Sequence, residues 1–455
     1  MHPVLSRFML VHISTIKPAF VKYSTIFFAL LIACSAPEEP KPEAYDWGPS
    51  PWAEIRKERI SKLLPKAMEA ADVDAWLVIC RENNNDPLAD HIGGENAGGT
   101  AVFLFINDEN GFKSIVFSPS GESTALAELE IHDEVISVER GSSSIEYAID
   151  FIKTKNFDRI AINSSARNAQ ADGLSYSQRL RLEAEMRPEL AKKLVSSEEL
   201  VYEWLSIKLP EEVEIMKEAA AFTALWQLEA YEMIVPGVTT DAQVAAFLKD
   251  KMKEYGVKDG WAPDQNPNVN SGADRGHSHA TDKVIMPGDV IQTDFGIKVH
   301  DRWVSDIQRF AYVLKEGERE APENIQFYWE SARAGNRAAY YAMIPGAKGV
   351  EVDAAQRVLM KENNSDYVMW STGHPVGYVA HDTGPNLGGS QAPSTRPAAQ
   401  KELKQGMVFA FDGFHAWKLA DGGTKTISVE EMAVITESGA EYLIAPQEEL
   451  ILVGN

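Results

Sequence analysis

The chain has 455 residues, of which 44% are hydrophobic and 24% are charged, and its formal net charge is −23. This length predicts two domains, and the composition is that of a folded globular protein rather than a disordered one. The strong acidity excludes nucleic acid and anionic membrane surfaces as its main partners. Two cysteines, Cys34 and Cys80, are too few for a disulfide framework. Cys80 ends an apolar run and is predicted to lie in a core.

The first 33 residues have the features of a signal peptide. Lys17 and Lys22 precede a short apolar run that ends Leu-Ile-Ala-Cys34, and a run this short does not span a membrane as a helix. The ending resembles the cleavage box of bacterial lipoproteins, in which the cysteine is acylated. We therefore expect a signal peptide over 1–33, a lipid on Cys34, and a Pro/Glu-rich tether over 34–50. The protein would then be anchored in the cell envelope, on the periplasmic side or the cell surface, and would meet the membrane only through this lipid. A plain cleaved signal peptide and a fortuitous apolar run are the alternatives.

Residues 51–205 alternate between helical and strand patterns. Apolar positions from Ile55 to Ala71 keep near-helical spacing. Strand-like runs follow at 75–80, 101–107, 114–118, 134–138 and 159–163. The alternation predicts a layered α/β domain, and it contains no glycine-rich phosphate loop. His91 lies in a Gly/Asn-rich loop and is expected at the surface.

The stretch Gly288–Asp306 predicts two short strands that fold back on each other. Gly296 and the polar run Lys298–Arg302 interrupt an otherwise apolar, β-branched pattern. Such a hairpin places Asp294 on one strand and Asp306 on the other, where their side chains can meet across the pair. Two facing carboxylates repel each other unless they share a proton or bind a cation.

The same pattern returns roughly 120 residues later. The spacing Gly-x-Val-x-x-x-Asp ends at Asp294 in the first copy and at Asp412 in the second, and Asp306 is matched by Glu430. Each copy follows an apolar helical run that ends in Pro-Gly. This is an internal duplication of helix, Pro-Gly, helix and hairpin. Two related halves that pack together would bring these four acids to one centre.

Four helices are predicted, two before each hairpin in the chain, over about 210–235, 242–255, 322–343 and 351–362. Pro210 and the two glutamates after it suit the first turn of the first helix. Thr240 and Gln243 form a predicted capping box for the second.

Two long loops rich in glycine and proline carry histidines. The loop Gly260–Asp282 holds His277, and the loop Gly373–Pro385 holds His374 and His381. Loops of this length in a compact domain are usually functional or mobile. Two histidines flanked by glycines, between two carboxylate hairpins, favour a functional role over that of ordinary hydrogen-bonded loop residues.

Over about residues 50–450, the chain resembles the creatinase, aminopeptidase P and prolidase family. The motifs that carry the resemblance are Ser206-Ile-Lys-Leu-Pro-Glu-Glu-Val, Asp294-x-Gly, Ser305-Asp306, Gly373-His374, His381, Gly406-Met-Val and Val429-Glu430-Glu431. The resemblance implies an α+β chain, with a pita-bread catalytic domain of pseudo-two-fold symmetry over 206–455 and a smaller creatinase-like α/β domain over 51–205. It also implies a metallopeptidase that acts on Xaa-Pro bonds of short proline-containing peptides, as a dipeptidase or an aminopeptidase. A homodimer is expected by analogy alone.

The resemblance further implies a two-metal site whose ligands are Asp294, Asp306, His374, Asp412 and Glu430. His381 and His277 would line the pocket without binding metal, His381 at the developing oxyanion and His277 at the proline side or carboxylate of the substrate. Asp412 and Glu430 would carry the proton to the leaving amine. Four carboxylates and one imidazole suit divalent transition metals, and we expect two manganese ions, with cobalt or zinc as alternatives. Such a pair would lower the pKa of a water between them and polarise the scissile carbonyl.

Three departures from the family bear on activity. Asp412 stands where the family usually has Glu, so its carboxylate is drawn back by about 1.5 Å, the length of one C–C bond. Ser428 replaces an arginine usually found two residues before the last glutamate. The spacing from Asp294 to Asp306 is one residue longer than usual, which a β-bulge or a longer turn would absorb. From the sequence we expect Asp412→Glu to give equal or higher activity.

Two other functions stay open. The first is a non-catalytic or degenerate pita-bread binding lipoprotein, which Asp412 and Ser428 motivate. The second is a metal-independent amidinohydrolase of the creatinase type. The five ligand-capable residues argue against this second function, because such relatives lose the metal-binding acids.

Overall fold

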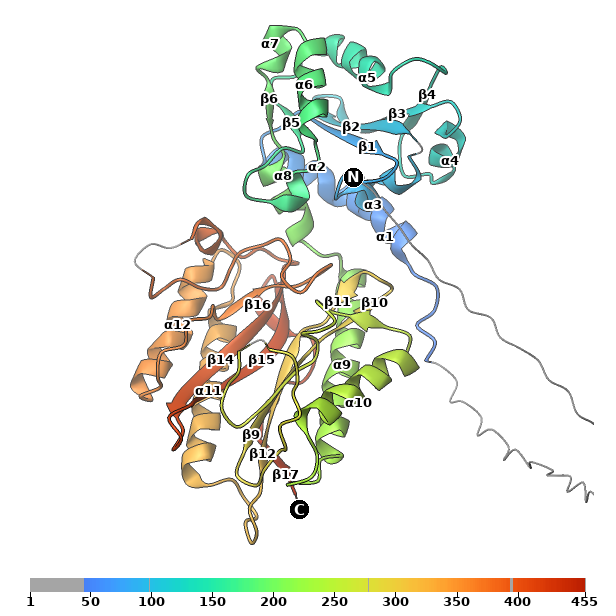
Figure 1. Ribbon diagram of the computed structural model, residues 1–455. Helices are drawn as coiled ribbons and strands as arrows, with labels where there is room; N and C mark the ends of the chain where they lie inside the picture. Colours follow the sequence, from blue (N-terminus) through green and yellow to red (C-terminus); the bar gives the residue numbers. More distant parts are fainter. Residues whose placement is uncertain (1–44, 98, 277, 393–395, 455) are drawn as a thin grey trace, which may run out of the picture. The chain divides into compact units, whose positions relative to one another are not determined.

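The computed structural model describes residues 45–97, 99–276, 278–392 and 396–454 (Figure 1). The expected signal peptide over 1–33 and the lipidation site Cys34 lie outside these residues and stay predictions, which the mass of the mature N-terminal peptide would test. Within the described part of the chain, no helix combines the length and the apolarity needed to cross a bilayer.

Only residues 45–50 of the predicted tether are described. The rings of Tyr45 and Trp47 lie edge-on to the ring of Phe222, with centroids 4.7 and 5.3 Å away. This end of the segment is therefore docked on a helix, and the tether prediction rests on residues 34–44, which are not described.

The first domain is built on a six-stranded sheet in the order β4-β3-β2-β1-β5-β6. Its strands are β1 (Ala75–Arg81), β2 (Thr100–Asp108), β3 (Gly111–Pro119), β4 (Glu134–Val138), β5 (Ile160–Ile162) and β6 (Leu194–Ser196). Its helices are α1 (Trp52–Glu58), α2 (Leu64–Ala70), α3 (Ala89–Ile92), α4 (Ser123–Glu128), α5 (Ser144–Lys153), α6 (Tyr176–Glu185), α7 (Pro188–Ala191) and α8 (Glu198–Ser206), and a π-helical segment (Arg59–Leu63) joins α1 to α2. All five predicted strands are present, whereas the three-residue β6 was not predicted.

Strand β1 is buried on both faces of this sheet. Successive side chains alternate between the two faces, so Val78 and Cys80 enter one apolar cluster while Leu77 and Ile79 enter the other. Cys80 is fully buried, as predicted.

The prediction that His91 lies at the surface is wrong. Its side chain is buried, with the rings of Trp52, Trp204 and Tyr378 at centroid distances of 5.4, 5.9 and 4.7 Å. These three aromatic residues are distant from His91 in sequence, so the local Gly/Asn-rich composition gave no sign of them. Burial lowers the pKa of His91 well below its ordinary value.

Asp86 is a buried carboxylate in this domain, only 5% exposed. It accepts hydrogen bonds from Asn163 Nδ2 at 2.9 and 3.0 Å and from the backbone N–H of Leu88 at 2.9 Å. Burial raises the pKa of Asp86 from 3.8 to about 6, because these bonds only partly replace the lost water.

Asp86 should therefore make the free energy of unfolding depend on pH. The folded protein holds the Asp86 proton up to higher pH than the unfolded chain does, so stability rises as pH falls from about 6 towards 3.8. The expected rise is about 3 kcal/mol, since one pKa unit corresponds to about 1.4 kcal/mol. Urea unfolding followed by tryptophan fluorescence at several pH values should show a rise that is about 3 kcal/mol larger in the wild type than in Asp86→Asn, which lacks this titrating group. Equal slopes in the two proteins would contradict the assignment.

The described residues of the second domain form four α-helices, a short 3-10 helix (Pro397–Gln400) and two sheets. The α-helices are α9 (Pro210–Glu232), α10 (Asp241–Glu254), α11 (Glu323–Ala342) and α12 (Gly349–Glu362), each within a few residues of its prediction. The capping box is also confirmed, since Thr240 Oγ1 accepts from Gln243 N and Thr240 N donates to Gln243 Oε1. In Figure 1, α9 and α10 lie along one half of the domain and α11 and α12 along the other.

The larger sheet joins the two halves of the duplication. Its order is β13-β14-β15-β12-β9-β8, with β16 paired to β15 and β17 paired to β12, while β11, β10 and β7 form a small separate sheet. The strands are β7 (Lys258–Asp259), β8 (Asn268–Ser271), β9 (Val290–Phe295), β10 (Ile297–Val299), β11 (Trp303–Val304), β12 (Ile307–Val313), β13 (Gly373–Pro375), β14 (Val408–Lys418), β15 (Thr424–Thr436), β16 (Gly439–Tyr442) and β17 (Ile451–Val453). The hairpin β9–β12 and the hairpin β14–β15 meet where β12 pairs with β15. The predicted pseudo-two-fold repeat is therefore present.

The first hairpin differs in register from its prediction. Gln308, not Asp306, lies opposite Asp294 in the ladder between β9 and β12. The tip is a three-residue turn in which His300 and Asp301 have φ of 51° and 59°. The pairing of β10 with β11 next to the turn and the pairing of β9 with β12 further along the hairpin have the same register. The hairpin therefore contains no bulge between them, and the longer turn accommodates the extra residue.

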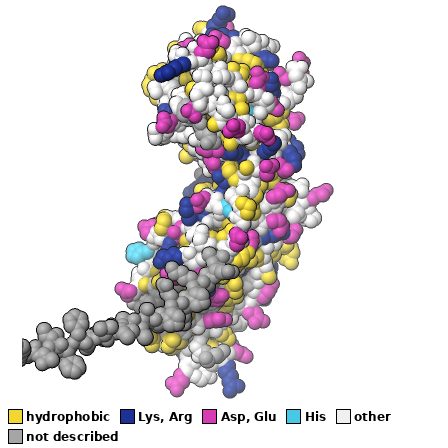
Figure 2. Space-filling view, turned by 90° about the vertical axis from the view of Figure 1, so that its right-hand side faces the viewer, with side chains coloured by type: hydrophobic (Ala, Val, Ile, Leu, Met, Phe, Trp, Pro, Cys, Tyr) yellow, Lys and Arg dark blue, Asp and Glu magenta, His cyan; other side chains and the backbone are white. Residues whose placement is uncertain are grey.

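Acidic side chains are dispersed over the face seen in Figure 2, with lysines and arginines between them. On this face, therefore, the acidic side chains do not gather into one charged docking surface.

Candidate metal centre

Four buried acids lie on the strands where the two hairpins meet. They are only 2–8% exposed: Asp294 lies on β9, Asp306 immediately before β12, Asp412 on β14 and Glu430 on β15. Asp412 and Glu430 are direct partners in the antiparallel ladder. The duplication predicted this convergence, and the structure brings all four to one cavity.

His374 reaches the same point from β13, which pairs with β14. Its Nε2 lies 3.8 Å from Asp306 Oδ2 and 3.6 Å from Glu430 Oε1. One ligand atom from each of these three residues lies within 4.8 Å of the other two. Asp306, His374 and Glu430 thus form a group that could hold a metal ion, with Asp294 and Asp412 beside it on the cavity wall.

The buried acids disfavour one another's ionised form. Burial raises the pKa values of three carboxyl groups well above their ordinary values, and the charge of Glu430 raises them further. The three are Asp294, Asp306 and Asp412. Removing carboxylates from water and placing them together disfavours the charged form of each. A wall of this kind is stable in its ionised form only when cations bind to it.

The cavity has a volume of about 630 Å³. Its wall combines the acids and His374 with uncharged polar groups and with three aromatic side chains, Trp261, Trp370 and Phe414. A cavity of this size and mixed character suits a small ligand.

The predicted histidines take different places. His381 is exposed and lines the cavity, and its ring stands edge-on to that of His374 with centroids 4.2 Å apart. Asp382 fixes the loop beside it, because its carboxylate accepts from the backbone N–H of Tyr378 at 2.9 Å and of Thr383 at 2.8 Å. His277 lies outside the described residues.

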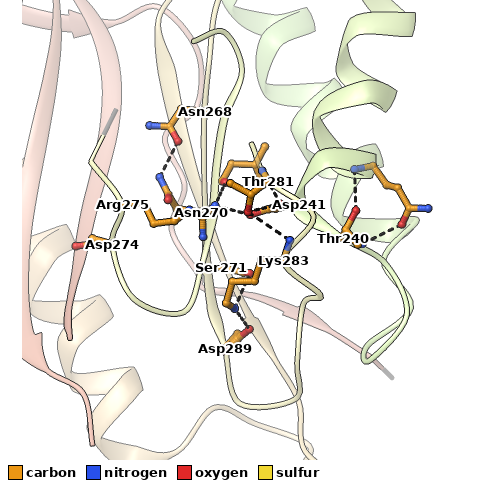
Figure 3. Close-up of polar contacts among 12 residues, drawn as sticks. Thr240, Asp241, Asn268, Asn270, Ser271, Asp274, Arg275, Thr281, Lys283 and Asp289 are labelled. Atoms are coloured by element: carbon orange, nitrogen blue, oxygen red, sulfur yellow. Dashed lines mark hydrogen bonds and ion pairs between the residues drawn. The ribbon is translucent and has the colours of Figure 1, made fainter. Parts of the chain in front are cut away.

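The loop in which His277 occurs is anchored at both sides of it (Figure 3). Asp241, fully buried at the start of α10, accepts a hydrogen bond from the backbone N–H of Thr281 at 2.9 Å and pairs with the guanidinium of Arg275. Lys283 donates to a serine hydroxyl on β8 at 3.0 Å. Sequence reasoning missed these anchors, because their partners come from different elements.

Residues 214–437 match the model of metallopeptidase family M24 (Peptidase_M24). This stretch of the chain is an M24 domain. Over 251 residues, the chain is 26% identical to the probable dipeptidase PepE of Mycobacterium tuberculosis, a match that covers 54% of this chain and 60% of that relative. The chain thus spans less than two thirds of this curated relative.

Solved structures share the fold of this chain. The X-Pro aminopeptidase of Thermotoga maritima has a TM-score of 0.62 at 22% identity, over 85% of this chain and 100% of that one. The prolidase of Pyrococcus furiosus has a TM-score of 0.58 at 21% identity, over 84% and 100%. At such identities the likeness establishes the fold, and it confirms the predicted pita-bread fold with its additional N-terminal domain.

The residues of the M24 domain fit the divalent metal ions that the family implies. Glu430 Oε2 is buried, and no group in the described part of the chain donates a hydrogen bond to it. An orphaned carboxylate oxygen is costly unless a cation binds it. Carboxylates and one imidazole are suitable donors for several divalent metals, so the donor set does not select one of them.

Sequence reasoning missed a second set of cavity residues in the M24 domain. Each lies two positions from one of the acids, and the period of two along a strand places it on the same face. They are Gln292, Gln308 and Phe414; Ser428, which the departure from the family had already singled out, has the same spacing. That spacing was a signal available in the sequence.

Proposed function

We propose that this protein hydrolyses peptide bonds in short peptides, and Xaa-Pro bonds in particular, with two divalent metal ions. The observation that carries the proposal is the convergence of four buried acids and His374 on one cavity of an M24 domain. The names of the structural neighbours, X-Pro aminopeptidase and prolidase, support the Xaa-Pro preference.

The proposed metal ligands are Asp294, Asp306, His374, Asp412 and Glu430. When bound, the two ions would polarise the scissile carbonyl and lower the pKa of a water molecule. Asp306, His374 and Glu430 already lie close enough together to share an ion. Manganese is the proposed metal, with cobalt and zinc as alternatives.

The remaining chemistry falls to residues of the chain. His381, beside His374 on the cavity wall, would donate a hydrogen bond to the carbonyl oxygen as it gains negative charge. Glu430 is the residue that would hold a proton before it passes to the leaving nitrogen, and Asp412 is the alternative. The aromatic side chains of Trp261, Trp370 and Phe414 give the cavity apolar surfaces on which a proline ring could pack.

A small substrate panel tests this function. The purified protein, freed of metal with EDTA, is assayed with Mn²⁺, Co²⁺ or Zn²⁺ on an Xaa-Pro dipeptide, an Xaa-Pro-Xaa tripeptide and matched peptides with Ala in place of Pro. We expect metal-dependent hydrolysis of the proline peptides, and the chain length that is preferred would separate a dipeptidase from an aminopeptidase. Metal binding without hydrolysis would favour the binding protein, and undiminished creatine hydrolysis in EDTA would favour the amidinohydrolase.

A further inference from the structure

Gln308 lies on β12 among the acids of the cavity wall. The strand register places it opposite Asp294 on β9 and opposite Glu430 on β15. Its side chain is buried and lines the cavity. An uncharged amide therefore lies between carboxylates, where a hydrogen bond from it could orient one of them.

Two neighbours fix the orientation of this amide. Gln308 Oε1 accepts from Ser428 Oγ at 2.8 Å and from Gln292 Nε2 at 2.6 Å, and Gln292 Nε2 also lies 3.3 Å from Ser428 Oγ. With two donors on its oxygen, the Gln308 amide must turn its NH₂ group the other way. That group donates to Asp412 Oδ1 at 3.4 Å. A flipped amide would face the NH₂ of Gln292 with its own NH₂.

The contact between Gln308 and Asp412 depends on the lengths of both side chains. The contact of 3.4 Å is longer than a typical N–H···O hydrogen bond, so asparagine at 308, shorter by about 1.5 Å, would lose it. Glutamate at 412 would reach about 1.5 Å further and meet the amide. This contact argues against the expectation from sequence that Asp412→Glu preserves or raises activity, and the two expectations are separated by the titration below.

We propose that Gln308 is a positioning residue, held by Gln292 and Ser428, that orients the shortened carboxylate of Asp412 for metal binding. The inference rests on the proposed metal centre. Groups that hold metal ligands in place typically contribute about 10–100-fold to metal affinity.

Moving one methylene group between the two residues tests this role. Isothermal titration of Mn²⁺ into the metal-free protein is compared for the wild type, Gln308→Asn, Asp412→Glu and the double variant. Each single change should weaken the more weakly bound ion by about 10–100-fold. In the double variant the two side chains together have the same number of methylene groups as in the wild type. Its Mn²⁺ affinity should therefore lie within about threefold of the wild-type affinity, because residues in contact are energetically coupled.

A matched control removes a methylene from another amide side chain, one that bonds the backbone of the same strand, β12. The side chain of Gln447 bonds the backbone N–H and C=O of Phe310 at 3.1 and 2.8 Å, and it does not line the cavity. Gln447→Asn should lower the melting temperature and leave Mn²⁺ affinity unchanged. A double variant whose loss equals the product of the single losses, or a control that weakens Mn²⁺ as much as Gln308→Asn, would overturn the proposal. A wild-type protein that binds no Mn²⁺ would refute the metal centre itself.

Discussion

Replacing Glu430 with glutamine is expected to abolish most activity while leaving the metal-free protein at least as stable as the wild type. Losing a group that only supports a metal ligand already costs up to about 100-fold, so losing a ligand should lower kcat/KM and metal affinity by more than about 100-fold. Stability in EDTA should hold or rise, because the charge of Glu430 opposes ionisation of Asp294, Asp306 and Asp412. The measurements are kinetics, metal content and the melting temperature in EDTA.

Glu431 provides the matched control, because adjacent residues of a strand point to opposite faces. Its carboxylate accepts two hydrogen bonds from the buried guanidinium of Arg309, both at 3.1 Å, and one from the backbone N–H of Gln447 at 2.7 Å. Glu431→Gln leaves Arg309 buried without its counter-charge, which should cost about 3–5 kcal/mol of stability with the metal ligands intact. Metal loss in Glu431→Gln, or a fully active Glu430→Gln, would contradict the assignment of the two faces.

Replacing Gly413 with alanine is expected to destabilise the protein by about 3 kcal/mol, at the upper end of the usual cost of overpacking. A Cβ at this position would lie 2.0 Å from Ala332 O and 2.2 Å from Asn336 N, both backbone atoms of α11. The helix cannot easily retreat, because Asn336 Nδ2 donates to Phe411 O at 3.0 Å. Either β14 or α11 must shift, and Asp412 is the next residue on β14. Metal affinity should therefore fall together with stability.

Gly121 is the control for this change. A Cβ there meets no heavy atom within 4 Å, so Gly121→Ala should change the free energy of unfolding by less than about 0.5 kcal/mol. Chemical denaturation of both variants and Mn²⁺ titration of Gly413→Ala give the comparison. A Gly413→Ala protein as stable as the wild type would contradict this close packing of α11 on β14.

Much of the fold and of the candidate site could be predicted, because it follows from sequence patterns that span only a few residues. The duplicated spacing that ends at Asp294 and Asp412 depends on strand periodicity, which is local, and so the convergence of the acids could be predicted. The capping box at Thr240 and Gln243 is likewise a contact between residues three apart. These features depend on the sequence near them and not on which distant segment packs nearby.

The parts that could not be predicted depend on the conformation of a turn, on side chains from distant segments, or on a strand with the composition of a loop. The register that sets Gln308 opposite Asp294 is fixed by the turn at His300 and Asp301, whose conformation the sequence left open between a turn and a bulge. The burial of His91 depends on aromatic rings contributed by other segments. Strand β8 was missed because it lies within a stretch rich in Asn, Gly and Pro, which is typical of loops.

The most direct test of the metal centre is a count of bound ions. Metal-free protein is dialysed against Mn²⁺, and its metal content is measured for the wild type and for a variant that combines Asp306→Asn, His374→Ala and Glu430→Gln. We expect two ions per chain in the wild type and a loss of binding in the variant. A wild type with no bound ion, or a variant that retains both, would contradict the proposal that the two halves of the chain build one metal centre.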